Sequence, residues 1–112
     1  MGVRTVPVGP EVANQLGLGA DSGLLISQVV PGSAADRAGL RGGSERAFLG
    51  NMPIMLGGDL LVAVDGEEVG DQQDLSHIMQ KHRSGDTVTV TVYRGKKRMD
   101  LKVVLGESTG AA

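Results

Sequence analysis

The sequence predicts a mainly β fold with helices (α+β), a small, partly open β-barrel or sandwich of five to six strands with one long and one or two short helices. Three observations support this class. Short β-prone segments recur between turns rich in glycine and proline. A single segment, residues 71–83, has the apolar periodicity of a helix of several turns. The length of 112 residues suits one domain.

The chain is expected to open with a strand and a short helix. Residues 3–8 form a β-prone run that Gly9 closes. Pro10 then suits the first turn of a helix, because its missing N–H has no partner at that position anyway. Gly17 is the expected stop of this helix.

The next pair of elements has clearer boundaries. Residues 23–30 are almost wholly apolar and stop at a Pro-Gly turn, which is typical of a buried strand. Ser33 is placed to cap a short helix over residues 34–38, and Gly39 to terminate it.

Residues 41–58 carry the weakest signal. They contain five glycines, one proline and a small apolar group around Ile54. This composition favours a long inserted loop that packs some side chains onto the domain.

The second half predicts a strand, a helix and a hairpin. Residues 59–64 form a strand that turns at Asp65-Gly66. Residues 71–83 form the long helix, capped by Asp71 or Asp74. Its apolar face comprises Leu75, Ile78, Met79 and His82.

The closing hairpin shows strict alternation. Valines and threonines alternate over residues 87–93, residues 94–97 form the turn, and a strand returns. Its inward side is Met99, Leu101, Val103 and Leu105.

Composition excludes several classes of function. The net charge of −2 with mixed signs argues against nucleic-acid binding, and Phe48 and Tyr93 are the only aromatic residues on which bases could stack. Without cysteine there is no disulfide, thiol catalysis or thiolate metal site. His77 and His82 project about 140° apart on a helix, so they suit no shared metal ion. No cofactor and no metal are expected.

Ser22 lies in an Asp-Ser-Gly sequence like the nucleophile turn of trypsin-like proteases. A nucleophilic serine needs a base within hydrogen-bond reach and a third group that orients the base. Both histidines lie on the predicted helix, and Leu24 stands where that turn needs another glycine. We therefore interpret Ser22 as a residue at the entry of a buried strand, and a small hydrolase that uses Ser22 as the rival hypothesis.

The first strand and the long helix suggest a binding geometry. Residues 3–8 are short and N-terminal, as expected of an edge strand, and the helix 71–83 has an apolar face. An exposed edge beside such a helix is a site where an extended peptide can add a strand. The same pattern also fits an ordinary core.

Four segments carry a resemblance to a known family. They read GLLISQVVPGSAADRAGLRGG, GGDLLVAVDGEEV, DLSHIM and GDTVTVTVYRGKKRMDLKVVL, in this order. Together they resemble a PDZ domain, and more closely the PDZ domains of bacterial HtrA/Deg-type serine proteases. The resemblance covers residues 2–105 and implies a PDZ-like fold with a peptide groove between one strand and the long helix.

The resemblance also implies the residues of the groove. The carboxylate-binding loop of this family reads apolar-Gly-apolar, which matches Met1, Gly2 and Val3. Backbone N–H groups of such a turn form a nest for a terminal carboxylate. The implied groove residues are Val3, Arg4, Thr5, Val6, Gln73, Leu75, Ser76, Ile78, Met79 and His82.

By resemblance, the chain is a non-catalytic domain that binds C-terminal or extended apolar peptide segments by β-strand addition. It would recruit unfolded protein substrates or regulate a separate protease domain of the same parent. The implied parent is a serine endopeptidase in protein quality control, periplasmic or membrane-anchored outside the cytoplasm, and a homotrimer or larger oligomer. Alternatives are a PDZ domain of a membrane-embedded metalloprotease or secretion component, or a purely structural assembly module.

The expected domain limits follow from the same motifs. We expect one PDZ domain over residues 1–106, with 41–58 as an inserted loop and 107–112 as a flexible C-terminal tail. The chain is expected to be an excised domain that begins within the carboxylate loop.

Overall fold

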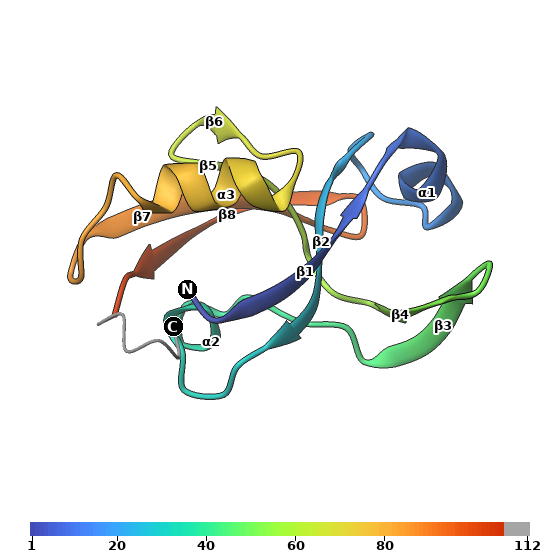
Figure 1. The fold of residues 1–112 in the computed structure, drawn as a ribbon, viewed down its shortest axis with the longest axis horizontal. Helices are drawn as coiled ribbons and strands as arrows, with labels where there is room; N and C mark the ends of the chain where they lie inside the picture. Colours follow the sequence, from blue (N-terminus) through green and yellow to red (C-terminus); the bar gives the residue numbers. More distant parts are fainter. Residues whose placement is uncertain (107–112) are drawn as a thin grey trace.

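A computed structural model describes residues 1–106, except the side chains of residues 49 and 52. The expected tail, 107–112, lies outside the described residues. The main sheet has the antiparallel order β1-β2-β5-β7-β8, and β6 pairs with β5 (Figure 1). Its strands are β1 (Val3–Val8), β2 (Gly23–Val29), β5 (Leu60–Val64), β6 (Glu67–Glu68), β7 (Thr87–Arg94) and β8 (Lys97–Val104). The sheet is open, with β1 and β8 as its edges, which confirms the predicted mainly β class.

Three helices accompany the sheet: α1 (Pro10–Gln15), α2 (Ala34–Ala38) and α3 (Gln72–Met79). The predicted caps are present. Ser33 Oγ accepts from the Asp36 N–H at 3.3 Å, and Asp71 Oδ1 accepts from the Asp74 N–H at 2.8 Å. These caps satisfy N–H groups that have no partner within the helix.

The long helix ends earlier than predicted. The α-helical part of α3 stops at Met79 instead of Arg83. Beyond it the chain tightens, because the N–H groups of Lys81 and His82 bond to carbonyls three residues back, at 3.1 Å each. The Arg83 N–H then donates to the side chain of Asp86 at 2.8 Å, which ends the helical path.

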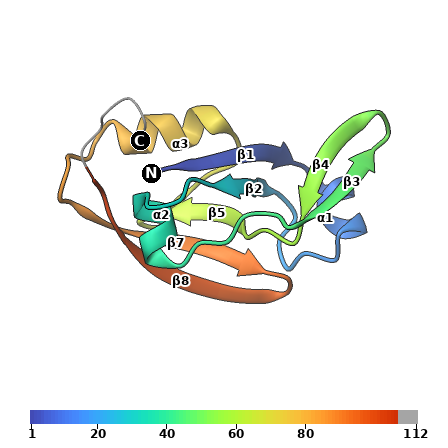
Figure 2. The ribbon, with the colours of Figure 1, turned by 90° about the horizontal axis from the view of Figure 1, so that it is seen from below.

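The stretch 41–58 is not the loop that the sequence suggested. It contains the antiparallel hairpin of β3 (Glu45–Leu49) and β4 (Met52–Leu56). Figure 2 shows this hairpin extending from the end of the domain at which β1 finishes. The expectation that its apolar residues pack on the body is confirmed by Ile54, which is buried.

The core has two parts, on opposite faces of β1 and β2. The first lies between the sheet and the helices α2 and α3, and includes Leu24, Ile26, Leu61, Val64, Leu75, Ile78, Val88, Val90, Val92 and Val103. The second comprises Val8, Leu25, Ile54 and Leu60, with residues of α1 and the hairpin around it. Edge strand β1 therefore packs against a core cluster on each of its two faces.

Candidate functional site: the free edge beside α3

The candidate site is the outer edge of β1. This strand pairs with β2 on one side, and within the described residues no strand pairs with its other side. Helix α3 runs beside that edge (Figure 2). Thr5 Oγ1 on β1 donates a 2.7 Å hydrogen bond to Gln72 Oε1 in the first turn of α3. The free strand edge and the helix therefore lie side by side, and we call the space between them the candidate groove.

The loop before β1 directs its carbonyl groups inward. Met1 O accepts from the Ala35 N–H at 3.0 Å, and Gly2 O accepts from the Val30 N–H at 2.8 Å. All peptide bonds are trans, and a planar trans peptide points its C=O and N–H in opposite directions. The N–H groups of Gly2 and Val3 therefore point away from α2 and β2, toward the open side.

The same reasoning applies to the peptide bond between Arg4 and Thr5. Arg4 O accepts from Ser27 Oγ at 3.1 Å, so it points toward β2. The Thr5 N–H, which shares that peptide plane, points toward the free edge. The register of β1 on β2 shifts here, since Arg4 faces Gln28 whereas Thr5 faces Ile26. Three backbone donors, those of Gly2, Val3 and Thr5, are thus available along the edge.

Gly2 is required by its surroundings. Its φ of +91° lies in the left-handed region that side chains rarely adopt. A Cβ at this position would also collide with Ser33 Cβ and lie 2.5 Å from Ser33 Oγ. The glycine lets the loop approach the N-terminus of α2 closely enough for Met1 O to accept the hydrogen bond from Ala35.

The floor of the groove is apolar. Leu75 and Ile78 of α3 are 4% and 3% exposed, so both belong to the core more than to the surface. The side chains of Met1, Val3 and Met79 are half-buried and pack against the same core cluster. These three side chains leave apolar surface accessible at the start of β1 and at the end of α3.

The remaining predicted residues of α3 are placed differently. Gln73 and Ser76 are exposed, and neither contacts β1 by a described hydrogen bond. Gln72 makes that contact instead, and sequence reasoning did not name it. The signal was present, because Gln72 stands three residues before Leu75 and therefore on the same helix face.

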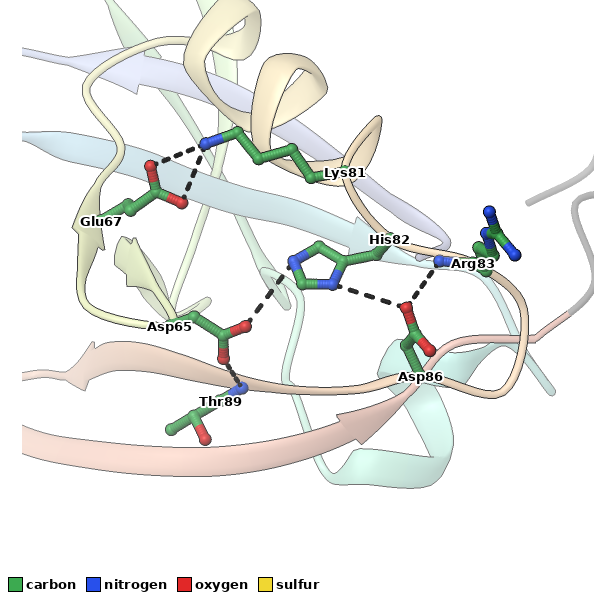
Figure 3. Close-up of polar contacts among 7 residues, drawn as sticks. All are labelled: Asp65, Glu67, Lys81, His82, Arg83, Asp86 and Thr89. Carbon is green, nitrogen blue, oxygen red and sulfur yellow. Dashed lines mark hydrogen bonds and ion pairs between the residues drawn. The ribbon is translucent and has the colours of Figure 1, made fainter.

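His82 lies in a polar cluster at the far end of α3 (Figure 3). Its Nε2 is 3.6 Å from Asp65 Oδ2, and its Nδ1 is 3.7 Å from Asp86 Oδ2. Both carboxylates have backbone partners, since Asp65 accepts from the Thr89 N–H and Asp86 from the Arg83 N–H. The imidazole thus links the end of α3 to the turns after β5 and before β7.

Arg4 and Val6 belong to the other face of β1. Val6 lines a cavity with residues of the hairpin β3–β4, and Arg4 is exposed. Because side chains alternate along a strand, these two cannot face α3 together with Val3 and Thr5. The groove therefore has two faces, and the predicted residues divide between them.

Ser22 opens β2 beside a separate cavity of about 430 Å³. Its lining includes the polar side chains of Asp21, Glu68, Thr91 and Arg98, but no histidine. Within residues 1–106 no group of three acidic, histidine or cysteine side chains could hold a metal ion. Over the same residues, no helix is both long and apolar enough for a membrane span.

Comparison with known proteins places this geometry in a family. The chain is 39% identical over 98 residues to Protease Do-like 8, chloroplastic, of Arabidopsis thaliana, which covers 88% of this chain and 20% of that protein. It is 30% identical over 105 residues to a probable periplasmic serine endoprotease DegP-like of Bartonella henselae, covering 94% of this chain and 18% of that protein. The chain thus spans about a fifth of the length of these relatives.

Two solved structures share the fold. The HtrA-type protease AlgW with decapeptide has a TM-score of 0.68 and 25% identity, covering 94% of this chain and 28% of that one. The HtrA3 PDZ domain bound to a phage-derived ligand has a TM-score of 0.67 and 19% identity, covering 93% of this chain and 81% of that one. A PDZ domain family model matches residues 1–105, and this chain therefore belongs to the PDZ domain family.

Proposed function

We propose that this chain binds the C-terminal segment of a polypeptide as an added strand on β1. The observation that carries the proposal is the set of outward N–H groups of Gly2, Val3 and Thr5 beside an apolar floor. The first two suit a terminal carboxylate, because adjacent backbone N–H groups form an anion-binding nest. The Thr5 N–H suits a carbonyl of the ligand two residues further back.

The ligand chemistry follows from the walls of the groove. Met1, Val3 and Met79 offer apolar surface at the carboxylate end, which favours an apolar last residue. The methionines also adapt their shape, since their side chains are unbranched. A solved relative, the HtrA-type protease AlgW, was determined with a decapeptide, which supports an extended peptide as ligand.

The wider setting of the domain belongs to the same proposal. The similarity to Do-like and DegP-like proteases supports a serine endopeptidase as the parent, with this domain recruiting substrate or regulating the protease domain. The catalytic residues would lie outside this chain, and residues 1–106 would form one domain. The relatives' names support a periplasmic or other extracytoplasmic location, with chloroplasts as the plant counterpart. A trimeric or larger parent remains part of the proposal.

The decisive experiment removes one backbone donor. Thr5→Pro deletes the N–H that faces the ligand, and proline is tolerated in edge strands whose N–H points outward. Because it also deletes the hydroxyl that bonds Gln72, Thr5→Ala is the matched control. The probe is a fluorescein-labelled decapeptide ending in Val, tested with a free and with an amidated C-terminus by fluorescence anisotropy.

We expect Thr5→Pro to weaken binding about tenfold or more, and Thr5→Ala to weaken it by less than about threefold. Amidation of the peptide's C-terminus should weaken its binding to the unmodified chain and to both variants. Thermal unfolding of each variant verifies that the fold is retained. Equal binding by the Pro and Ala variants, or indifference to amidation, would rule out strand addition with carboxylate capture.

A further inference from the structure

The face of β1 that points away from α3 carries a second cavity. It has a volume of about 200 Å³ and lies between β1, β2 and the hairpin β3–β4. Its lining residues are Val6, Ser27, Arg46, Pro53, Ile54 and Met55. Cavities of about 150 Å³ in other proteins hold a benzene ring, so this space is large enough for a side chain.

The hairpin that forms the outer wall is held firmly on the domain. Ile54 is 3% exposed and packs with Val8, Leu25 and Leu60. At the base, the Gly43 N–H donates to Ser27 O at 3.0 Å. A Cβ at Gly58 would collide with Ile26 O, so the chain passes directly over β2 there. The cavity is therefore a fixed part of the fold.

Charge on this face is unbalanced. Arg46 on β3 and Arg4 on β1 are both exposed, and neither forms an ion pair among the residues that the structure describes. Besides Arg46, the cavity lining is mostly apolar and includes Val6, Ile54 and Met55. The combination suits a side chain with an aliphatic stem and a carboxylate end.

The face of the hairpin that carries Arg46 also carries an exposed aromatic side chain. Arg46 and Phe48 stand two residues apart on β3, so they share one face of the hairpin. Phe48 is 65% exposed, which is unusual for an aromatic side chain. A chain leaving the cavity in this direction meets apolar surface.

The position of the cavity relative to the free edge fixes which part of a peptide meets it. A ligand whose carboxylate lies at Gly2 runs antiparallel to β1, so its earlier residues pass Thr5 and then Val6. Paired strands advance residue by residue, so with the third-last ligand residue beside Thr5, the residue three positions before the C-terminus lies beside Val6. Alternate residues of that strand point away from α3, toward the hairpin.

We propose that this cavity is a second specificity site, which takes an acidic side chain, best glutamate, three to five residues before the C-terminus of the peptide. The proposal rests on strand addition to β1 as the proposed function. Arg46 holds the carboxylate, Arg4 adds to the positive potential, and Val6, Ile54 and Met55 contact the stem. Ligands of this domain are thus selected at two points, by an apolar C-terminus at α3 and by an upstream acid at the hairpin.

A glutamate scan tests the proposal. The probes are decapeptides ending in Val that carry one Glu at each of the positions three to seven residues before the C-terminus, each paired with the Gln peptide. Affinities are measured for the unmodified chain, for Arg46→Gln, and for Arg98→Gln, which removes an exposed arginine at the opposite edge of the sheet. A pentapeptide with the same C-terminus serves as the short ligand.

One position, three to five residues before the end, should favour Glu over Gln by about 2- to 5-fold, as for exposed ion pairs. Arg46→Gln should abolish this preference and Arg98→Gln should keep it, and higher salt should weaken it. If the decapeptides bind but no position prefers Glu, or the preference survives Arg46→Gln, the second site is refuted while strand addition stands. If neither the decapeptides nor the pentapeptide bind, strand addition itself fails, and the second site with it.

Discussion

Arg94 and Asp59 form a bidentate ion pair within the domain. Arg94 Nε lies 2.8 Å from Asp59 Oδ1, and Nη2 lies 2.9 Å from Oδ2. Asp59 is fully buried, and its Oδ2 also accepts from the Arg41 N–H at 3.0 Å. Arg94 Nη2 reaches Gly39 O as well, at 3.0 Å. The pair thus joins β7 to the segment that leads from α2 into the hairpin.

Removing the partner of a buried charge should cost far more than removing an exposed pair. Arg94→Met leaves the Asp59 carboxylate buried without its counter-ion, so we expect a loss of about 3–5 kcal/mol in the free energy of unfolding. Lys81→Met removes the exposed ion pair with Glu67 and should cost less than about 1 kcal/mol. Urea unfolding followed by circular dichroism measures both. Similar losses in the two variants would contradict the structural role of the Arg94–Asp59 pair.

The guanidinium of Arg94 should keep its charge, and so its ion pair with Asp59, at high pH. The hydrogen bond with Asp59 raises the pKa of Arg94 above its ordinary value. A raised pKa means that the stabilisation is lost only as the pH rises through the folded-state value, which lies beyond the range in which proteins are studied. Arg94→Lys replaces the fork by a single point charge with an ordinary pKa near 10.4. A paired lysine loses its stabilising charge only above its unfolded-state pKa, so the stability difference between the two proteins should widen above about pH 10.4, and a constant difference would contradict the pair.

The close contact between Gly2 and Ser33 gives a prediction about the loop. Gly2→Ala forces a side chain into the left-handed region and against Ser33, so it should displace the Met1 carbonyl from α2. Gly50→Ala is the matched control, because Gly50 has a φ of +60° with open space around it. Both variants should lose about 1–2 kcal/mol from backbone strain, and Gly2→Ala should lose more. Only Gly2→Ala should also weaken binding of the decapeptide. Equal losses of stability and of peptide affinity in the two variants would argue against a specific role of Gly2.

The α-amino group of Met1 should make stability depend on pH. Burial lowers its pKa below the ordinary value of about 8. The unfolded chain then binds more protons than the folded one, so this group destabilises the fold as the pH falls below about 8. An N-acetylated chain lacks the group and is otherwise identical. The stability advantage of the acetylated chain should grow as the pH falls below about 8, and a pH-independent difference would contradict this prediction.

The sequence allowed most of the sheet to be predicted, but not the hairpin. Strand alternation over residues 87–93 and the caps at Ser33 and Asp71 depend on local spacing, which the sequence displays directly. The five glycines of residues 41–58 suggested a loop. Yet Gly50-Asn51, a dipeptide typical of two-residue hairpin turns, stands at the hairpin tip. That signal was outweighed by glycines whose role is close approach to β2, a contact that no local pattern reveals.

In the candidate site, too, some features could be predicted from the sequence and others depend on tertiary contacts. Met1, Gly2 and Val3 followed from family resemblance, and apolar periodicity indicated the floor of the groove. The separation of Arg4 and Val6 from the α3 face follows from strand alternation and could have been predicted. The position of His82 between Asp65 and Asp86 could not, because it depends on how the turns after β5 and before β7 meet the end of α3.

Ile54 and Phe48 distinguish a packed hairpin from a surface loop. Ile54 is 3% exposed against Leu25 and Leu60, so Ile54→Ala should destabilise the domain by about 2–5 kcal/mol. Phe48 is 65% exposed on the same hairpin, so Phe48→Ala should change stability by no more than about 0.5 kcal/mol. Urea unfolding of both variants measures the contrast. A loop with no fixed contact would give two small values, and in that case the cavity beside Val6 would also lose its outer wall.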